Sequence, residues 1–240
     1  MTTPVRRVGV WSTTEEIKRY IIEAGLRPGD PVPTEAELGA ILGVSRSSIR
    51  EAIRTLASLD IVEVRHGHGT YVGAMSLAPL VNGMVFRLTL DAAHTLQSLR
   101  DVVTTRISLD LALADDVVAC HRGRKDPDLH RLVADMRAHS AAGRSFLQED
   151  CAFHTALLHH IDNRIIAELA GAFWEIHTRA VPLLGISPPE DLSETVEAHA
   201  AILHAVETGD RDGYVAAVHA HYAPLVRAID RKVSSLEQSG

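Results

Sequence analysis

Three histidines and one aspartate in the second half of the chain have the residue types and spacing of a divalent metal site. Asp150 and His154 are four residues apart, so on a helix both side chains project from the same face. His199 and His221 are each 11 residues from Asp210, so an antiparallel helical hairpin that turns there holds both imidazoles at about the same height. Three imidazoles and one carboxylate inside a helical bundle suit a divalent transition metal and leave one or two coordination positions open.

Chance is the alternative explanation for this spacing, because the chain contains 14 histidines. Several pairs at helical spacing then arise without any function. Five other histidines are interpreted as ordinary surface residues or as helix residues with satisfied hydrogen bonds: His159, His160, His177, His204 and His219. The identity of a metal does not follow from the ligands, because Zn, Ni, Mn, Co and Fe all accept three histidines and an aspartate.

A basic helix in the first half of the chain carries a different chemistry. Arg46, Arg50 and Arg54 recur every four residues and therefore line one face, opposite an apolar face made by Ile49, Ala52, Ile53 and Leu56. Most exposed charge stripes are only solvated surface. Here, however, hydroxyl groups that can donate to phosphates crowd the positive N-terminal end of the helix, on Ser45, Ser47 and Ser48. That clustering favours DNA binding.

The elements around the basic helix predict a winged helix-turn-helix. A capping box at Thr34 begins one helix, Gly43 ends it, and Ser45 caps the next. Short strands are predicted over 62–65 and 70–72, joined through glycines. A turn between two helices, of which the second has one apolar and one guanidinium face, is the layout of a DNA-reading element.

The rest of the chain has helical periodicity. After a connector around 73–79, we expect helices near 78–89, 94–120, 126–141, 145–161, 165–182, 191–208 and 211–235. The predicted fold is therefore mainly α, with a winged helix-turn-helix domain in 1–74, a connector with a short helix in 75–93, and an all-α metal- and effector-binding bundle in 94–235.

The charge of the chain limits how it could bind DNA. The net charge is −7, whereas residues 1–73 contain nine Lys or Arg and nine Asp or Glu. All the excess negative charge therefore lies in the remainder of the chain. Affinity must come from a few well-placed arginines rather than from a broad basic surface.

A reduced, cytoplasmic location is the expectation from cysteine usage and hydropathy. The chain has two cysteines, Cys120 and Cys151, without a CxxC motif. It contains no secretory signal and no apolar run approaching the roughly 20 residues that a transmembrane helix requires. No membrane partner is expected.

The first 72 residues resemble the winged helix-turn-helix of the GntR family of bacterial repressors. The matching runs are Arg27-Pro28-Gly29-Asp30, Val44-Ser45-Arg46, Arg50-Glu51-Ala52 and the wing Gly67-His68-Gly69-Thr70-Tyr71-Val72. The resemblance implies DNA contacts by Ser45, Arg46, Ser47, Ser48 and Arg50, and entry of the wing tip, His66 and Gly67, into the minor groove. Ala36 stands where the family usually has an arginine, so the operator preference of relatives does not transfer.

Residues from about 95 to 230 resemble the FCD ligand-binding domain of the FadR subfamily. The matching runs are Asp150-x-x-Phe153-His154, His199 followed by Ile202-Leu203, the Gly209-Asp210 turn, and His221. In metal-dependent members of that family, the ligands occupy the positions of Asp150, His154, His199 and His221. The resemblance therefore implies the same four ligands as the spacing.

Arg106 is the residue that we expect to bind an effector. The family has an arginine followed four residues later by an acid on the long first helix of the bundle, and Arg106 with Asp110 fits, although aspartate replaces the usual glutamate. The implied role is a charge-assisted bond to an effector carboxylate beside the metal. The alternative is a structural salt bridge between Arg106 and Asp110.

The sequence thus predicts a homodimeric transcription regulator that acts as a repressor. It would bind double-stranded operator DNA and respond to a small organic acid held at a divalent metal site. A regulator that senses the metal alone is one alternative. A metal-dependent enzyme is the other, but the chain has no HExxH motif, no Gly-rich phosphate loop and no nucleophile with an adjacent base. Dimerisation is implied by the family and by operator symmetry.

Overall fold

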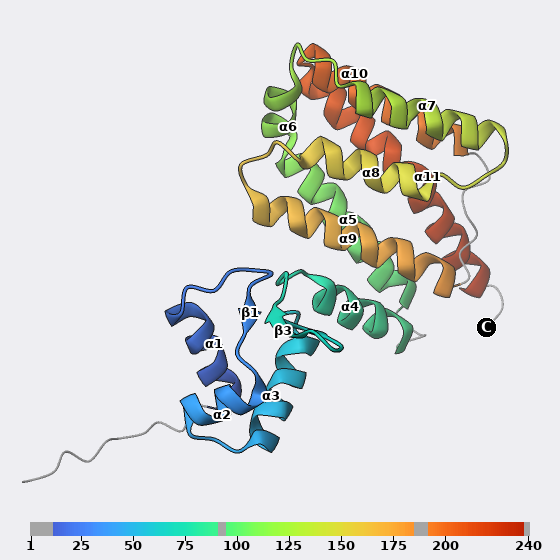
Figure 1. Cartoon of the computed structure of the whole chain (residues 1–240). Helices are drawn as coiled ribbons and strands as arrows, with labels where there is room; N and C mark the ends of the chain where they lie inside the picture. The colour runs from blue at the N-terminus through green and yellow to red at the C-terminus, as the bar shows by residue number, and fades with distance from the viewer. Residues whose placement is uncertain (1–11, 91–94, 185–191, 238–240) are drawn as a thin grey trace, which may run out of the picture. The chain divides into compact units, whose positions relative to one another are not determined.

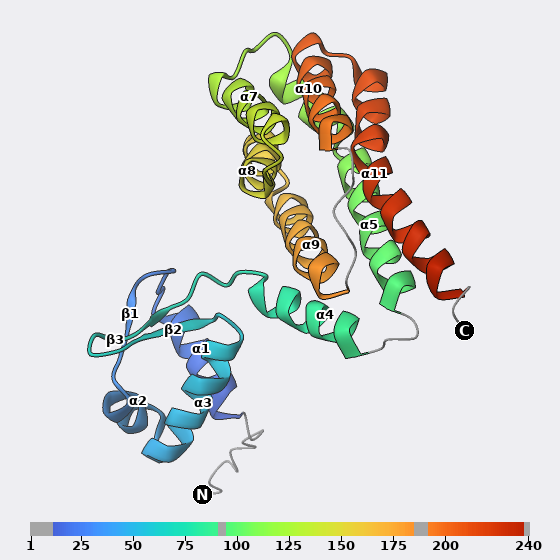
Figure 2. The same ribbon diagram turned by 90° about the vertical axis from the view of Figure 1, so that its right-hand side faces the viewer.

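The computed structural model describes residues 12–90, 95–184 and 192–237. The chain divides into two compact units, Met1–Pro79 and Leu80–Gly240 (Figures 1 and 2). Among the described residues, no helix is both long enough and apolar enough to span a membrane.

Side-chain caps set the helix boundaries of the first unit, whose helices are α1 (Thr13–Glu23), α2 (Glu35–Leu42) and α3 (Arg46–Ser58). The Thr34 hydroxyl accepts from the backbone N–H of Glu37, and the Glu37 carboxylate accepts from the backbone N–H of Thr34, which completes the predicted capping box. Gly43 ends α2 in the left-handed conformation, with φ 68°. The Ser45 hydroxyl then accepts from the backbone N–H of Ser48 at the start of α3.

The sheet of the first unit has three strands in the order β1-β3-β2, one more than predicted. Its strands are β1 (Pro31–Val32), β2 (Val62–Arg65) and β3 (Gly69–Val72), and all neighbours are antiparallel. The sequence pattern did not predict β1, because this strand begins with a proline and is followed by another. Proline is tolerated on an edge strand, where its missing N–H removes no ladder bond.

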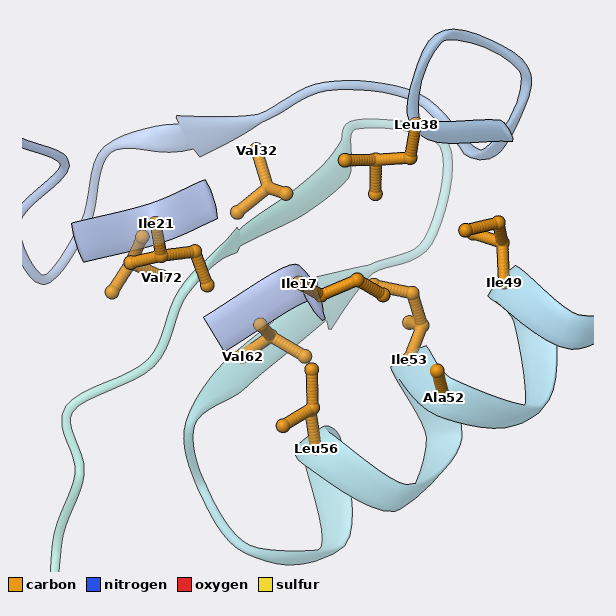
Figure 3. Packing of buried hydrophobic residues seen from close by; sticks show 10 residues of the cluster. All are labelled: Ile17, Ile21, Val32, Leu38, Ile49, Ala52, Ile53, Leu56, Val62 and Val72. Carbon is orange, nitrogen blue, oxygen red and sulfur yellow. The ribbon is translucent and has the colours of Figure 1, made fainter. Parts of the chain in front are cut away.

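A single apolar core joins the helices to the sheet in this unit (Figure 3). It consists of buried side chains from α1, α2, α3 and all three strands: Ile17, Ile21, Val32, Leu38, Ile49, Ala52, Ile53, Leu56, Val62 and Val72. Because this core fixes the apolar face of α3, the opposite face of the helix is turned to solvent.

In the second unit, the described residues form helices joined by short connections, and none of them lies in a strand. Its helices are α4 (Ala78–Leu90), α5 (Thr95–Ala112), α6 (Ala114–His121), α7 (Pro127–Ala141), α8 (Leu147–Leu158), α9 (Arg164–Leu183), α10 (Leu192–Thr208) and α11 (Arg211–Glu237). α10 and α11 pack together as the predicted hairpin (Figure 2). α5 packs against α9 and α11, while α8 packs against α7 and α9.

The single helix that we expected over 94–120 is wrong, because α5 and α6 are separate helices. They are divided at Leu113, whose φ of −90° and ψ of −1° depart from regular helical values. Leu113 and Ala114 are both buried, so the break lies inside the apolar core. A one-residue break does not disturb the apolar periodicity on either side. The sequence pattern therefore predicted one continuous helix.

Candidate metal centre and nucleic-acid interface

Three helices of the second unit bring the four predicted metal ligands together. Asp150 and His154 lie one turn apart on α8, His199 is on α10, and His221 is on α11. The turn between α10 and α11 contains Gly209 in the left-handed region, with φ 76°. It places the rings of His199 and His221 with their centroids 4.5 Å apart. His199 and His221 therefore lie at the same height along the hairpin, as their equal distance in sequence from Asp210 predicts.

The four side chains form one buried cluster. Each offers one potential ligand atom, and these atoms all lie within 4.8 Å of one another. Nε2 of His199 is 2.7 Å from Oδ1 of Asp150, and Nε2 of His154 is 3.7 Å from the same oxygen. A cation placed among the four would be within reach of three nitrogens and one oxygen, the donor set of a transition-metal site.

The hydrogen bonding of the cluster fits a cation rather than a closed polar network. Four buried atoms meet in the cluster without a donated hydrogen bond among them: Asp150 Oδ1, His154 Nε2, His199 Nε2 and His221 Nδ1. The 2.7 Å contact between His199 Nε2 and Asp150 Oδ1 is no exception in a neutral ring, because its one proton lies on Nδ1, which donates to Thr195. Buried polar atoms are almost always paired, since an unpaired one costs free energy on folding. One bound cation would satisfy all four atoms together.

Outer hydrogen bonds orient two of these side chains. Nδ1 of His199 donates to the backbone carbonyl of Thr195 over 2.8 Å, which in a neutral imidazole leaves the lone pair on Nε2 pointing into the cluster. The indole N–H of Trp174, on α9, donates to Oδ2 of Asp150 over 2.6 Å. Second-shell bonds of both kinds typically fix the tautomer or orientation of metal ligands.

Burial and mutual charge tune the cluster toward the protonation states that a metal requires. Burial lowers the pKa of His154 to about 3. Burial, reinforced by repulsion from neighbouring imidazoles, holds the pKa of His221 well below its usual range. Burial opposes ionisation of Asp150, but its interactions with His199 and His154 outweigh burial and hold the pKa of the carboxyl well below its ordinary value. Neutral imidazoles and an ionised carboxylate are the forms that coordinate metals.

Arg106 is buried in the same unit, and its contacts differ from the salt bridge that was the alternative to an effector-binding role. Nη1 donates to Nδ1 of His177, on α9, over 2.7 Å, and the guanidinium carbon lies 4.9 Å from the centre of the Tyr222 ring. Asp110 instead accepts from the Tyr222 hydroxyl over 2.5 Å. No contact of ion-pair length between Arg106 and Asp110 occurs in the described part of the chain. Burial raises the pKa of the Asp110 carboxyl, and the charge of Arg106 offsets this only in part.

A cavity of about 620 Å³ connects the metal cluster with the arginine. Its lining includes His154 of the cluster, Arg106 and Asp110 of α5, and Trp174 of α9. The volume lies in the range of small-molecule sites. An acid in this cavity could therefore contact the buried guanidinium and a metal at the cluster at the same time.

Sequence reasoning missed three residues of this site: Trp174, His177 and Tyr222. The interpretation of His177 as an ordinary surface or satisfied helix residue is incomplete, because its imidazole is the hydrogen-bond acceptor of Arg106. No spacing rule could find these residues, since each contacts a partner on a helix distant in the sequence. The adjacency of Tyr222 to His221 was the one available signal.

The outer face of α3 presents the predicted DNA-contacting groups to solvent. Arg46, Arg50 and Arg54 are exposed, and so are the three serines at its N-terminus. The hydroxyl of Ser45 lies 2.8 Å from that of Ser47 and 2.9 Å from that of Ser48. This cluster stands at the end of the helix where backbone N–H groups favour phosphate.

The three arginines of this face differ in their ion pairing. Arg50 contacts Glu35 of α2 with 3.1 Å between Nη2 and Oε2, and Arg54 contacts Glu51 over 2.7 Å. Arg46 has no ion pair among the described residues. Exposed ion pairs of this kind contribute little to stability because water screens them, so the contact with Glu35 does not prevent Arg50 from binding another anion.

The wing tip has the backbone geometry of a tight hairpin loop. The N–H of His68 donates to the carbonyl of Arg65 over 2.9 Å, and Gly67 between them has φ 77°. A left-handed residue at this turn position favours glycine. His66 and Gly67 are consequently exposed at the end of the two longer strands. The guanidinium carbon of Arg65 lies 4.2 Å from the centre of the Tyr71 ring, so a cation–π contact joins β2 to β3 next to this turn.

Comparison with known proteins identifies the class to which these two units belong. Residues 12–72 match the bacterial regulatory proteins of the gntR family, and residues 101–224 match the FCD domain. The chain therefore belongs to the GntR family and is a DNA-binding transcription regulator with an FCD domain, an architecture that fits the FadR subfamily. The matched families and the relatives named here are regulators, so the protein is not an enzyme.

Individual relatives agree with this assignment. NedR of Micromonospora viridifaciens is 36% identical over 108 residues, which cover 45% of this chain and 78% of NedR. The galactonate operon transcriptional repressor of Escherichia coli is 21% identical over 81% of this chain and 85% of its own length. The solved structure of a Streptococcus agalactiae GntR protein is similar with a TM-score of 0.63 and 28% identity, over 90% of this chain and 98% of that one.

Proposed function

We propose that the protein is a homodimeric repressor that releases its operator when a small organic acid binds at a divalent metal site in the FCD domain. One observation carries this proposal: four unpartnered ligand atoms converge beside a cavity that is also lined by a buried arginine. A buried guanidinium favours a carboxylate partner, which it can bind with two parallel hydrogen bonds.

The metal would be held by Asp150, His154, His199 and His221. Zn, Ni, Mn, Co and Fe all suit this donor set, and supply would decide among them. When bound, the ion would offer its open positions to oxygen atoms of the acid. Arg106 would bind the acid from α5.

Operator recognition would depend on the exposed face of α3 and on the wing. Arg46, Arg50 and the N-terminal serines of α3 would contact bases and phosphates, while His66 and Gly67 would enter the minor groove. Two copies would read the two halves of a pseudo-palindromic operator in the cytoplasm. The acid would favour a dimer geometry in which the two reading helices no longer match the spacing of the half-sites.

The relatives support an acid as the signal. The galactonate operon repressor carries a sugar acid in its name. A regulator that senses the metal alone is the competing function, but it would not need a buried arginine in the cavity wall.

A titration of operator release separates the two functions. Chelator-treated protein on a fluorescent operator would first receive Zn²⁺, Ni²⁺, Mn²⁺, Co²⁺ or Fe²⁺ alone, and then each metal with D-galactonate, L-lactate or citrate. We expect release only when metal and acid are both present. Release by metal alone would make the protein a metal sensor. Native mass spectrometry of protein purified without chelator would report the metal, any retained acid and the dimer together.

A further inference from the structure

Two side chains on one turn of α9 contact both halves of the site. Trp174 and His177 are three residues apart, so they share a face of the helix. Their rings meet edge to face, with 6.1 Å between centroids and an angle of 90°. α9 packs against α8, which carries Asp150, and against α5, which carries Arg106 (Figure 1).

The contact of Trp174 determines which oxygen of Asp150 faces the cluster. The indole N–H donates to Oδ2 over 2.6 Å, whereas Oδ1 lies among the imidazoles, 2.7 Å from Nε2 of His199. An aspartate held by its outer oxygen presents one oxygen, in a fixed direction, to a cation. Outer-shell bonds of this kind raise metal affinity by orienting the ligand before the metal arrives.

The contact of His177 fixes the guanidinium in the same way. Nη1 of Arg106 donates to Nδ1 of His177 over 2.7 Å. Arginine has only donors, so the imidazole must present an unprotonated nitrogen. Burial, reinforced by the charge of Arg106, lowers the pKa of His177 well below its usual range and keeps the ring neutral. Tyr222 lies against the guanidinium as well, which confines it further.

We propose that Trp174 and His177 are positioning residues of this site. Trp174 orients Asp150 for a metal ion. His177 orients Arg106 for a carboxylate. One turn of α9 would thereby determine the distance between the metal and the Arg106 guanidinium, the two groups that an acid would contact. The carboxylate half of this inference rests on the proposed function, whereas the metal half does not depend on an acid.

The metal half is tested by titrating Co²⁺ into chelator-treated full-length protein. Trp174→Phe should weaken Co²⁺ binding by about 10–100-fold, the usual effect of losing an outer-shell partner. The control His204→Leu, which alters an exposed histidine of α10, should leave Co²⁺ affinity unchanged. Wild-type affinity in the Trp174→Phe protein would overturn this half. If that variant does not fold, the wild-type indole N–H resonance of Trp174 decides: it should shift when Zn²⁺ is added, and an unchanged resonance would contradict the inference.

The carboxylate half, in which His177 orients Arg106, is tested with two substitutions at His177. His177→Asn retains an acceptor near the place of Nδ1, whereas His177→Leu removes it. In operator-release titrations with D-galactonate and L-lactate, His177→Leu should raise the acid concentration for half-release by about tenfold or more, because a buried donor loses its partner. His177→Asn should restore most of the wild-type response. Equal responses of wild type and His177→Leu would overturn this half.

An acid-independent measurement separates failure of this inference from failure of the proposed function. Two-bond ¹H–¹⁵N spectra of Zn²⁺-loaded wild-type protein should show His177 neutral, with Nδ1 unprotonated. A protonated Nδ1 at neutral pH would overturn the arginine contact. If neither acid releases the wild-type protein while these spectra and the Co²⁺ titration agree with the expectation, then the choice of acids in the proposed function fails and the positioning role stands.

Discussion

Replacing His221 with alanine should abolish the metal-dependent part of the stability of the second unit. A metal at the cluster would connect α8, α10 and α11, and α11 contributes only His221 to it. Loss of this ligand leaves three donors and opens the cluster along one side. Because a metal that binds only the folded state stabilises that state by mass action, the variant should lose this stabilisation.

The size of the effect follows from mass action. A metal at 100 to 1,000 times its dissociation constant stabilises the folded state by about 2.7–4.1 kcal/mol. In a unit of roughly 150–250 residues, 1 kcal/mol shifts the Tm by about 2–4 °C. The wild-type protein should therefore show a Tm higher by roughly 5–16 °C with metal than with chelator. His221→Ala should show almost no such difference.

Thermal unfolding with and without chelator, together with metal analysis of the purified protein, measures this quantity. The chelator baseline of each variant accounts for packing that is lost with the imidazole. His219→Ala is the matched control, because His219 lies two residues away on α11 and is exposed. It should keep the full metal-dependent shift. Full metal content or an undiminished shift in the His221→Ala protein would refute the placement of the site.

Three further predictions concern the DNA-reading face, the effector arginine and pH. Arg50→Ala and Arg46→Ala should each weaken operator binding by about 1–3 kcal/mol, measured by fluorescence anisotropy at moderate salt; wild-type affinity in both would make this face solvated surface only. Arg106→Ala should retain metal but need a much higher acid concentration to release DNA, and a wild-type response would remove it from the effector site. In chelator-treated protein, His154 should lower the free energy of unfolding by about 2 kcal/mol between pH 7 and 5, because the unfolded histidine gains a proton near pH 6.5 while the folded pKa is about 3. Urea unfolding measures this loss, and a constant free energy of unfolding over that range would contradict the buried neutral state.

The sequence alone determined the local features of both units. Capping groups at Thr34 and Ser45 fixed the starts of α2 and α3, since a cap needs only residues within one turn. The four-residue spacing of Asp150 and His154 and the equal arms of the hairpin around Asp210 made these residues candidates, because helix geometry converts spacing directly into direction and height. Spacing alone left chance as the alternative, and the resemblance to the FCD domain was needed to select these four.

Tertiary packing alone decided the contacts between helices that are distant in the sequence. Arg106 and Asp110 have the spacing of a salt bridge, yet Arg106 bonds to His177 of α9 and Asp110 to Tyr222 of α11. The role of Trp174 was not predictable for the same reason. The separation of α5 from α6 at Leu113 was missed because the break leaves the apolar periodicity unchanged. Helical periodicity reports which face of a helix is buried, but it contains no information about which residue of another helix will lie against that face.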